Sequence, residues 1–252
     1  MLDHLPGSVH LAPDVDELYE QLGALLMACA FEAVGSRGEF HLALSGGSTP
    51  ERFYMCLVTD PHFRHLPWKQ THVWVVDERR VPETDERSNW KMMTESLVAH
   101  VPVRRRQTHP MPVMDADPAA KYEAALRDAL GDEGRLDFVL LGMGDAGHTA
   151  SIFPHSDAVH VRDRWVTVND GPQVRPPPRV TMSCPRRNAA RRIIVLVTGE
   201  KKTARLRDVD QRMADAGPDP ERLPITGIDP TDGKLTWYLD NPAAGLTTAQ
   251  PS

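Results

Sequence analysis

The sequence predicts an α/β fold of three layers, in which helices cover both faces of a mainly parallel sheet. Short segments that are apolar throughout alternate, almost from end to end, with segments whose apolar residues recur at helical spacing. Strands that are apolar on both faces are typical of doubly wound, Rossmann-like sheets. No repeat or long low-complexity tract divides the chain, so we expect residues 1–252 to form one domain. A small extra subdomain between about residues 155 and 190 stays open.

Capping residues mark where the first predicted helices begin. Asp14 is a suitable N-cap, with a glutamate three residues later and an apolar stripe at helical spacing behind it. An apolar strand is expected at residues 40–44. Thr49 and Pro50 then suit the N-cap and the first position of a helix that reaches about residue 58.

The same alternation continues along the rest of the chain. Ser88 can cap a helix to about residue 98, and Asp117 opens another helix that Gly131 closes. A further helix is expected from about Glu200. The remaining apolar segments predict buried strands at residues 72–76, 136–141, 192–197 and 235–239.

Composition disfavours several classes of protein. The chain has 252 residues, 40% of them hydrophobic, and a net charge of −6 from 29 basic and 35 acidic side chains. This suffices for a core of normal size, and the mild acidity disfavours a nucleic-acid partner. No uncharged stretch approaches the roughly 20 residues of a membrane span, and the first residues lack the pattern of a secretion signal. Three widely spaced cysteines suit a reducing compartment, so we expect a cytoplasmic protein without a membrane partner.

Polar or glycine-rich segments follow four of the predicted strands. In parallel sheets, ligands bind beyond the carboxyl ends of the strands. We therefore expect one ligand site where these four segments meet, namely residues 45–50, 77–82, 142–154 and 199–202.

The first of these segments suits an anion. Gly46 and Gly47 let the backbone approach a ligand closely, while Ser45, Ser48 and Thr49 add hydroxyls beside a helix N-terminus. On these residues alone, phosphate binding and a plain capped turn are equally supported. A nucleoside triphosphate is disfavoured because Gly-Lys-Ser/Thr occurs nowhere in the chain. Since no G-x-S-x-G elbow is present, Ser45 is a poor nucleophile.

The third segment contains G-x-G-x-x-G from Gly142 to Gly147, which is the pattern of a dinucleotide-binding turn. Pro154 follows too early for the long helix of such a turn, so NAD and FAD are disfavoured. The better interpretation is a strand-end loop that presents His148 to a cleft, where an imidazole can act as a general base. A histidine that only caps a helix is the alternative.

Charged side chains in and near the other segments have two interpretations each. Asp77, Glu78 and Arg79 could orient a base or hold a phosphate, or could form an ion-pair cluster that only ties loops together. Arg179, made rigid by the prolines before it, and Lys202 suit a bound phosphate, but both could be solvated instead. No metal site is predicted, because no third ligand accompanies the His-x-x-His pair at residues 62–65.

Six segments together carry a resemblance to a known family. They occur in the same order as in that family and cover about 200 residues. The segments are SGGSTP at 45–50, DERRVP at 77–82 with Ser88-Asn89 behind it, GMGDAGHTASIFP at 142–154, PPPRVT at 176–181, VTGEKK at 197–202 and WYLDNPAA at 237–244. In these segments the chain resembles the 6-phosphogluconolactonases. Their wider family includes the amino-sugar-phosphate isomerases and deaminases.

The resemblance implies hydrolysis of 6-phospho-D-glucono-1,5-lactone to 6-phosphogluconate, in the oxidative pentose phosphate pathway. It implies no metal and no organic cofactor, a sugar phosphate lactone as the small-molecule partner, and a monomer or small homo-oligomer. His148 is then the base that activates water, and Asp77 and Arg79 are active-site residues. The substrate-binding residues that the resemblance implies are Ser45, Gly46, Gly47, Ser48, Thr49, Arg179 and Lys202.

One position departs from the family pattern. Ala146 stands where the family carries an aspartate, and Asp145 lies one residue earlier. Either Asp145 substitutes after a small backbone shift, or His148 works alone at a reduced rate, or the chain is an impaired homologue that only binds a sugar phosphate. An amino-sugar-phosphate deaminase/isomerase is a further alternative. It is disfavoured because Phe153 stands where that group carries a glutamate.

Overall fold

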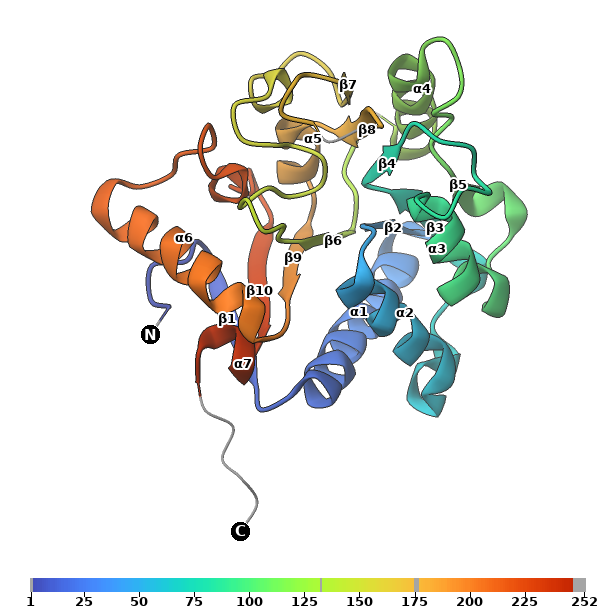
Figure 1. Ribbon diagram of the computed structural model, residues 1–252. Helices are drawn as coiled ribbons and strands as arrows, with labels where there is room; N and C mark the ends of the chain where they lie inside the picture. Colours follow the sequence, from blue (N-terminus) through green and yellow to red (C-terminus); the bar gives the residue numbers. More distant parts are fainter. Residues whose placement is uncertain (1, 132, 175–176, 247–252) are drawn as a thin grey trace.

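The main sheet is parallel throughout, in a computed structural model that describes residues 2–131, 133–174 and 177–246. Pro176 of the predicted rigid segment lies outside these residues. Within them, seven strands pair in the order β1-β10-β9-β6-β2-β3-β5 (Figure 1). Their bounds are β1 Ser8–Ala12, β2 Phe40–Leu44, β3 Thr71–Val75, β5 Thr108–His109, β6 Phe138–Gly142, β9 Arg192–Val197 and β10 Lys234–Asp240.

The strands predicted from apolar runs are confirmed. The bounds at residues 40–44 and 192–197 are unchanged, and the other three predicted strands differ by one or two residues at either end. All five residues of β2 are buried, as expected for a strand covered on both faces. The edge strand β1 was not predicted, and its burial pattern explains why, since only Ala12 of its five residues is buried.

Helices lie on both sides of this sheet. Crossovers between parallel strands are right-handed, so α1, α2 and α3 lie on one face and α4 and α6 on the other. Figure 1 shows α1 and α6 on opposite sides of β9 and β10. The helices are α1 Val15–Arg37, α2 Ser48–Thr59, α3 Asn89–Ser96, α4 Pro118–Leu130, α5 Cys184–Asn188, α6 Thr203–Ala216 and α7 Asn241–Ala244. Short 3₁₀ turns occur at Pro61–His65, Trp68–Gln70, Val98–His100, Arg105–Gln107, Asp157–Val159, Glu200–Lys202 and Pro224–Gly227.

Most of the predicted caps are confirmed. The Asp14 carboxylate accepts from two backbone N–H groups of the first turn of α1, and Ser88 and Asp117 cap α3 and α4 in the same way. Gly131 ends α4. These residues were predictable because a cap bonds to backbone only two or three positions away.

Two helix starts differ in detail from the prediction. Thr49 is not the N-cap, because α2 begins at Ser48 and its N-cap is Gly47. The φ of Gly47 is 111°, in the region that favours glycine. The hydroxyl of Thr49 instead bonds to that of Thr198 at 3.0 Å, so the first turn of α2 has no side-chain cap. The helix expected from Glu200 begins at Thr203, after a 3₁₀ turn.

A small antiparallel sheet adjoins the end of β3 and includes part of residues 155–190, the segment in which the sequence left an extra subdomain open. It consists of β4 Asp77–Arg79, β8 Arg179–Met182 and β7 Val166–Asn169, in the order β4-β8-β7. Figure 1 shows it at the top of the view, near α4 and α5. β8 begins at Arg179, directly after Pro178.

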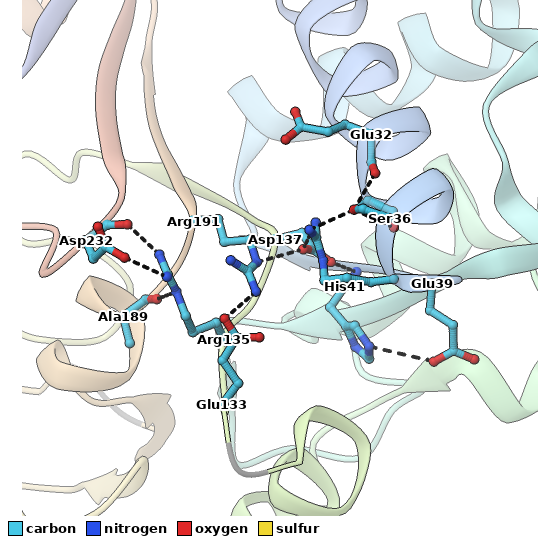
Figure 2. A network of polar contacts seen from close by, with 12 residues as sticks. Glu32, Ser36, Glu39, His41, Glu133, Arg135, Asp137, Ala189, Arg191 and Asp232 are labelled. Carbon is cyan, nitrogen blue, oxygen red and sulfur yellow. Dashed lines mark hydrogen bonds and ion pairs between the residues drawn. The ribbon is translucent and has the colours of Figure 1, made fainter.

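A buried carboxylate, that of Asp137, links α1, β2 and the segment before β9 at the amino ends of the central strands (Figure 2). Asp137, only 5% exposed, precedes β6 and accepts from the backbone N–H of His41 in β2 at 2.8 Å. It also pairs with Arg37 at the end of α1 at 2.7 Å and with Arg191 before β9 at 3.3 Å. The network lies at the end of the sheet opposite the predicted ligand segments.

Asp137→Ala is expected to lower the free energy of unfolding by about 2 kcal/mol, because two arginines and one buried N–H lose their acceptor. Denaturant titration measures this loss. Asp232→Ala is the control, since Asp232 pairs with Arg135 from an 85% exposed side chain and should cost less than about 1 kcal/mol. Equal losses for the two variants would contradict the role given to Asp137.

Candidate active site

A cavity of about 260 Å³ lies beyond the carboxyl ends of the central strands. The chain leaves β2 for β3 on one side and later returns to β6 on the other side, so the strand order reverses beside β2. Open α/β sheets bind ligands at such a reversal. All four segments predicted to meet there contribute to the wall, which is formed by residues 45–50, Asp77, Arg79, Asn89, 142–144, 148–150, 196–198 and Lys202.

The structure brings nearly all the predicted site residues together. Those that line the cavity are Ser45, Gly46, Gly47, Ser48, Thr49, Asp77, Arg79, His148 and Lys202. Arg179 does not line it. Arg179 lies on β8 opposite Arg79 of β4, and its guanidinium donates to the carbonyl of Pro177.

His148 is held against the backbone of its own loop. Its carbonyl accepts from the N–H of Gly144 at 2.9 Å, and a Cβ on Gly144 would lie 2.0 Å from the imidazole Cε1. Phe153 packs against the ring with 4.6 Å between centroids. Nδ1 is buried and has no hydrogen-bond partner among the described residues. The imidazole is therefore confined between a glycine and an aromatic ring at the cavity wall.

Burial lowers the pKa of His148 from its ordinary value of 6.5. The charge of Asp77 opposes this shift most strongly, that of Lys202 adds to it, and that of Asp145 opposes it more weakly. A neutral imidazole at neutral pH is the form that a general base requires.

Asp145 is engaged at the cationic side of the cavity. Its carboxylate is 95% exposed and lies 2.5 Å from Nζ of Lys202, and its carbonyl accepts from Arg205 at 2.8 Å. The Asp145 carboxylate is therefore engaged with Lys202, and the charge of Asp77 raises the pKa of His148 more than that of Asp145 does.

Asp77 and its neighbour Glu78 are held by hydrogen bonds. Asp77 accepts from the hydroxyl of Ser151 at 2.5 Å through Oδ2, and its carbonyl accepts from Nδ2 of Asn89 at 2.7 Å. Glu78, 2% exposed, accepts from the Ser88 hydroxyl and from the backbone N–H groups of residues 79, 89 and 90. Glu78 thus fixes α3 against β4, and this fixes Asn89 in the cavity wall.

The loop after β2 forms the part of the wall suited to an anion. The first turn of α2 has no side-chain cap, and the Ser45 hydroxyl is buried without a hydrogen-bond partner among the described residues. A Cβ on Gly46 would lie 1.8 Å from Oδ1 of Asn89, so only glycine fits there. Uncapped N–H groups, a helix dipole and the nearby Lys202 favour a bound anion.

Several contributors to this site were not predicted. Ser151 received no role from the sequence, Asn89 was noted only within the resemblance, and Glu78 was noted only as part of the charged group at residues 77–79. Thr149 lines the cavity with a buried hydroxyl that lacks a partner among the described residues. Their functions depend on contacts between segments far apart in the chain, for which a single sequence carries no spacing signal.

The part of the chain that the structure describes offers neither a metal-binding cluster nor a membrane-spanning helix. It contains no group of three or more His, Cys, Asp or Glu side chains that could hold a metal ion. None of its helices combines the length and apolarity needed to span a membrane.

Comparisons with known proteins agree on one family. Residues 13–237 match the family model described as glucosamine-6-phosphate isomerases/6-phosphogluconolactonase. A 6-phosphogluconolactonase from Nostoc is 38% identical over 92% of this chain and 95% of its own length. The GDH/6PGL endoplasmic bifunctional protein of Oryctolagus cuniculus is 40% identical over 89% of this chain. This chain spans only 28% of the length of that protein and of its human counterpart. A solved 6-phosphogluconolactonase from Leishmania guyanensis superposes with a TM-score of 0.77 at 28% identity, covering 94% of this chain and 97% of its own.

Proposed function

We propose that this chain, which belongs to the glucosamine-6-phosphate isomerase/6-phosphogluconolactonase family, hydrolyses 6-phospho-D-glucono-1,5-lactone to 6-phospho-D-gluconate. The observation that carries this proposal is one cavity whose wall includes both a confined imidazole and the uncapped start of α2. The first suits attack by water on a carbonyl, and the second suits a phosphate at the other end of the same substrate.

His148 acts as the general base in this proposal. It takes a proton from water while the oxygen of that water bonds to the lactone carbonyl carbon. The bond from this carbon to the ring oxygen then breaks, and the ring oxygen takes the proton back from the imidazolium to become a hydroxyl. A δ-lactone is an activated ester, so a positioned water, a base and charge stabilisation at the oxyanion suffice. No cofactor is required for these steps.

The substrate phosphate binds at the start of α2 and to Lys202, with Arg79 as a second cation in the wall. Backbone N–H groups and an ammonium suit a dianion. Binding the phosphate away from the reacting carbonyl orients the ring, which removes much of the entropic barrier. Arg179 pairs with Arg79 across β4 and β8 and is absent from the cavity wall, so we assign it a weaker influence on substrate binding through its charge.

A coupled assay tests the function. Glucose-6-phosphate dehydrogenase generates the lactone in situ, and acid release is followed above the spontaneous rate of ring opening. We expect clear acceleration by the protein. Binding of 6-phosphogluconate without acceleration would instead indicate an impaired, binding-only homologue. Ammonia release from glucosamine 6-phosphate would indicate a deaminase, which Phe153 against the imidazole disfavours.

Lys202→Ala is expected to raise KM about 10-fold with little change in kcat, because phosphate binding is shared by the ground and transition states. Steady-state kinetics of lactone hydrolysis measure both parameters. Lys201→Ala is the matched control, since Lys201 is adjacent in the chain and absent from the cavity wall. An unchanged KM in Lys202→Ala would contradict the assignment.

The acidic limb of kcat/KM is expected to lie below pH 6.5, because burial lowers the pKa of His148 from that value. The base works when neutral, so activity is retained as pH falls until the imidazole takes up a proton. Asp77→Asn removes the charge that raises this pKa most, so the limb should move to still lower pH. A limb above pH 7, or a shift in the opposite direction, would show that another group titrates.

The compartment, the oligomeric state and the single-domain organisation remain predictions. We propose one domain, a monomer or small homo-oligomer, and a cytoplasmic location. The printed names of relatives include "chloroplastic" and "endoplasmic" forms, so family membership alone leaves the compartment open.

A further inference from the structure

Ser151 connects the loop of the candidate base to the carboxylate of Asp77. It follows His148 by three residues in the chain and is only 1% exposed. Its Oγ donates to Oδ2 of Asp77 at 2.5 Å. Asp77 is itself 7% exposed and lines the cavity, so the bond joins two buried groups at the wall of the site.

The backbone of Ser151 is anchored to the small antiparallel sheet. Its carbonyl accepts from Nδ2 of Asn169, in β7, at 2.8 Å. Its N–H donates to Oγ1 of Thr181, in β8, at 3.4 Å. Thr181 is the residue opposite Asp77 in the pairing of β8 with β4. Through one residue, therefore, all three strands of the small sheet are joined to the loop that carries His148.

The backbone between His148 and Ser151 adopts a conformation that neighbouring contacts must stabilise. Ala150 has a φ of +50°, in the left-handed region that costs a non-glycine residue energy. Such a conformation persists only where contacts on either side maintain it. The three hydrogen bonds of Ser151 on one side and the packing of the His148 ring on the other supply those contacts.

We propose that Ser151 is a positioning residue for the reaction, whose hydroxyl orients the Asp77 carboxylate and whose backbone holds the loop that carries His148. The inference rests on the proposed lactonase function. With Oδ2 bound to Ser151, rotation of the carboxylate is restricted. Fixed orientation matters because small misplacements of reacting groups have large effects on rate.

Ser151→Ala removes the hydroxyl and is tested by steady-state kinetics of lactone hydrolysis. We expect kcat to fall by about 10- to 100-fold while KM changes by less than about 3-fold. In an Asp77→Asn background, the same substitution should lower kcat by less than about 2-fold, because the group through which it acts is already gone. A purely structural serine would instead give the same factor in both backgrounds.

Ser156→Ala is the matched control. Ser156 is equally buried at 1% and bonds to the same Nδ2 of Asn169 at 3.1 Å, but its hydroxyl donates to the Phe153 carbonyl rather than to Asp77. We expect a similar loss of thermal midpoint in both alanine variants, about 2–4 °C, and a loss of kcat in Ser151→Ala alone. If Ser151→Ala does not fold, Ser151→Cys, with its weaker S–H donor, should show the same fall in kcat.

The outcomes separate the two proposals. If the unmodified protein does not accelerate lactone opening, the proposed function is wrong. If it is active and Ser151→Ala or Ser151→Cys folds with an unchanged kcat, the positioning role is wrong and the function stands. Equal factors in the native and Asp77→Asn backgrounds would also overturn the positioning role.

Discussion

His148→Ala is expected to lower kcat for lactone hydrolysis by at least about 10²-fold, because general-base catalysis contributes roughly 10²- to 10⁴-fold. The groups that we propose to bind the phosphate lie on other segments of the cavity wall, so KM should change by less than about 3-fold. Steady-state assays with the lactone generated in situ, corrected for spontaneous opening, measure both values.

His160→Ala is the control for this substitution. His160 also lies after β6, but it pairs with Glu221 at 3.0 Å and its side chain is 69% exposed. It should leave the kinetics unchanged. If His148→Ala retained full activity, water would be activated by another group, and Asp77 would become the first candidate because it lines the same cavity.

The parts of the fold that were predictable from sequence depend on local or uniform signals. Strands such as β2 and β9 are buried on both faces, so each appears as an unbroken apolar run. Asp14 bonds to N–H groups two and three residues later, within its own turn. Signals of this range can be identified without knowledge of the rest of the chain.

The structural features that the sequence did not predict correctly depend on contacts between residues far apart in the chain. Thr49 is a good N-cap by residue type, but its hydroxyl is taken by Thr198, 149 residues away. The strands β4 and β7 are three and four residues long, and each exists through antiparallel pairing with β8. A short strand stabilised by distant partners carries no periodicity of its own.

The residues of the candidate site also fall into those that local sequence signals predict and those that depend on long-range contacts. The four strand-end segments were predictable, because parallel strands bring their carboxyl ends to one edge. The supporting groups were not: Glu78 acts by fixing α3, and Ser151 by holding Asp77. Arg179 has the side chain expected for phosphate binding, but it lies outside the cavity wall. The register of β8 with β4 sets its position opposite Arg79.

Gly144→Ala is expected to lower kcat by about 10²-fold, a loss typical of catalytic groups displaced by about 1 Å. A Cβ at this position would lie 2.0 Å from Cε1, 2.3 Å from Nε2 and 2.4 Å from Nδ1 of His148. The imidazole must therefore move, and Phe153, with 4.6 Å between ring centroids, limits where it can go. The methyl group thus displaces the imidazole, our proposed base, without removing it.

The kinetics of Gly144→Ala can be compared with those of Gly142→Ala, because a Cβ on Gly142 meets no atom within 4 Å. Neither glycine has a positive φ, so alanine strains neither backbone. Gly142→Ala adds a methyl group at the cavity wall but leaves the imidazole in place, so any contact with the substrate should appear in KM and kcat should fall by no more than about 3-fold. Both variants should keep a thermal midpoint within about 4 °C of the parent protein. Equal kcat values for the two variants would mean that the position of the His148 ring does not limit the reaction, which would remove the main support for its role as the base.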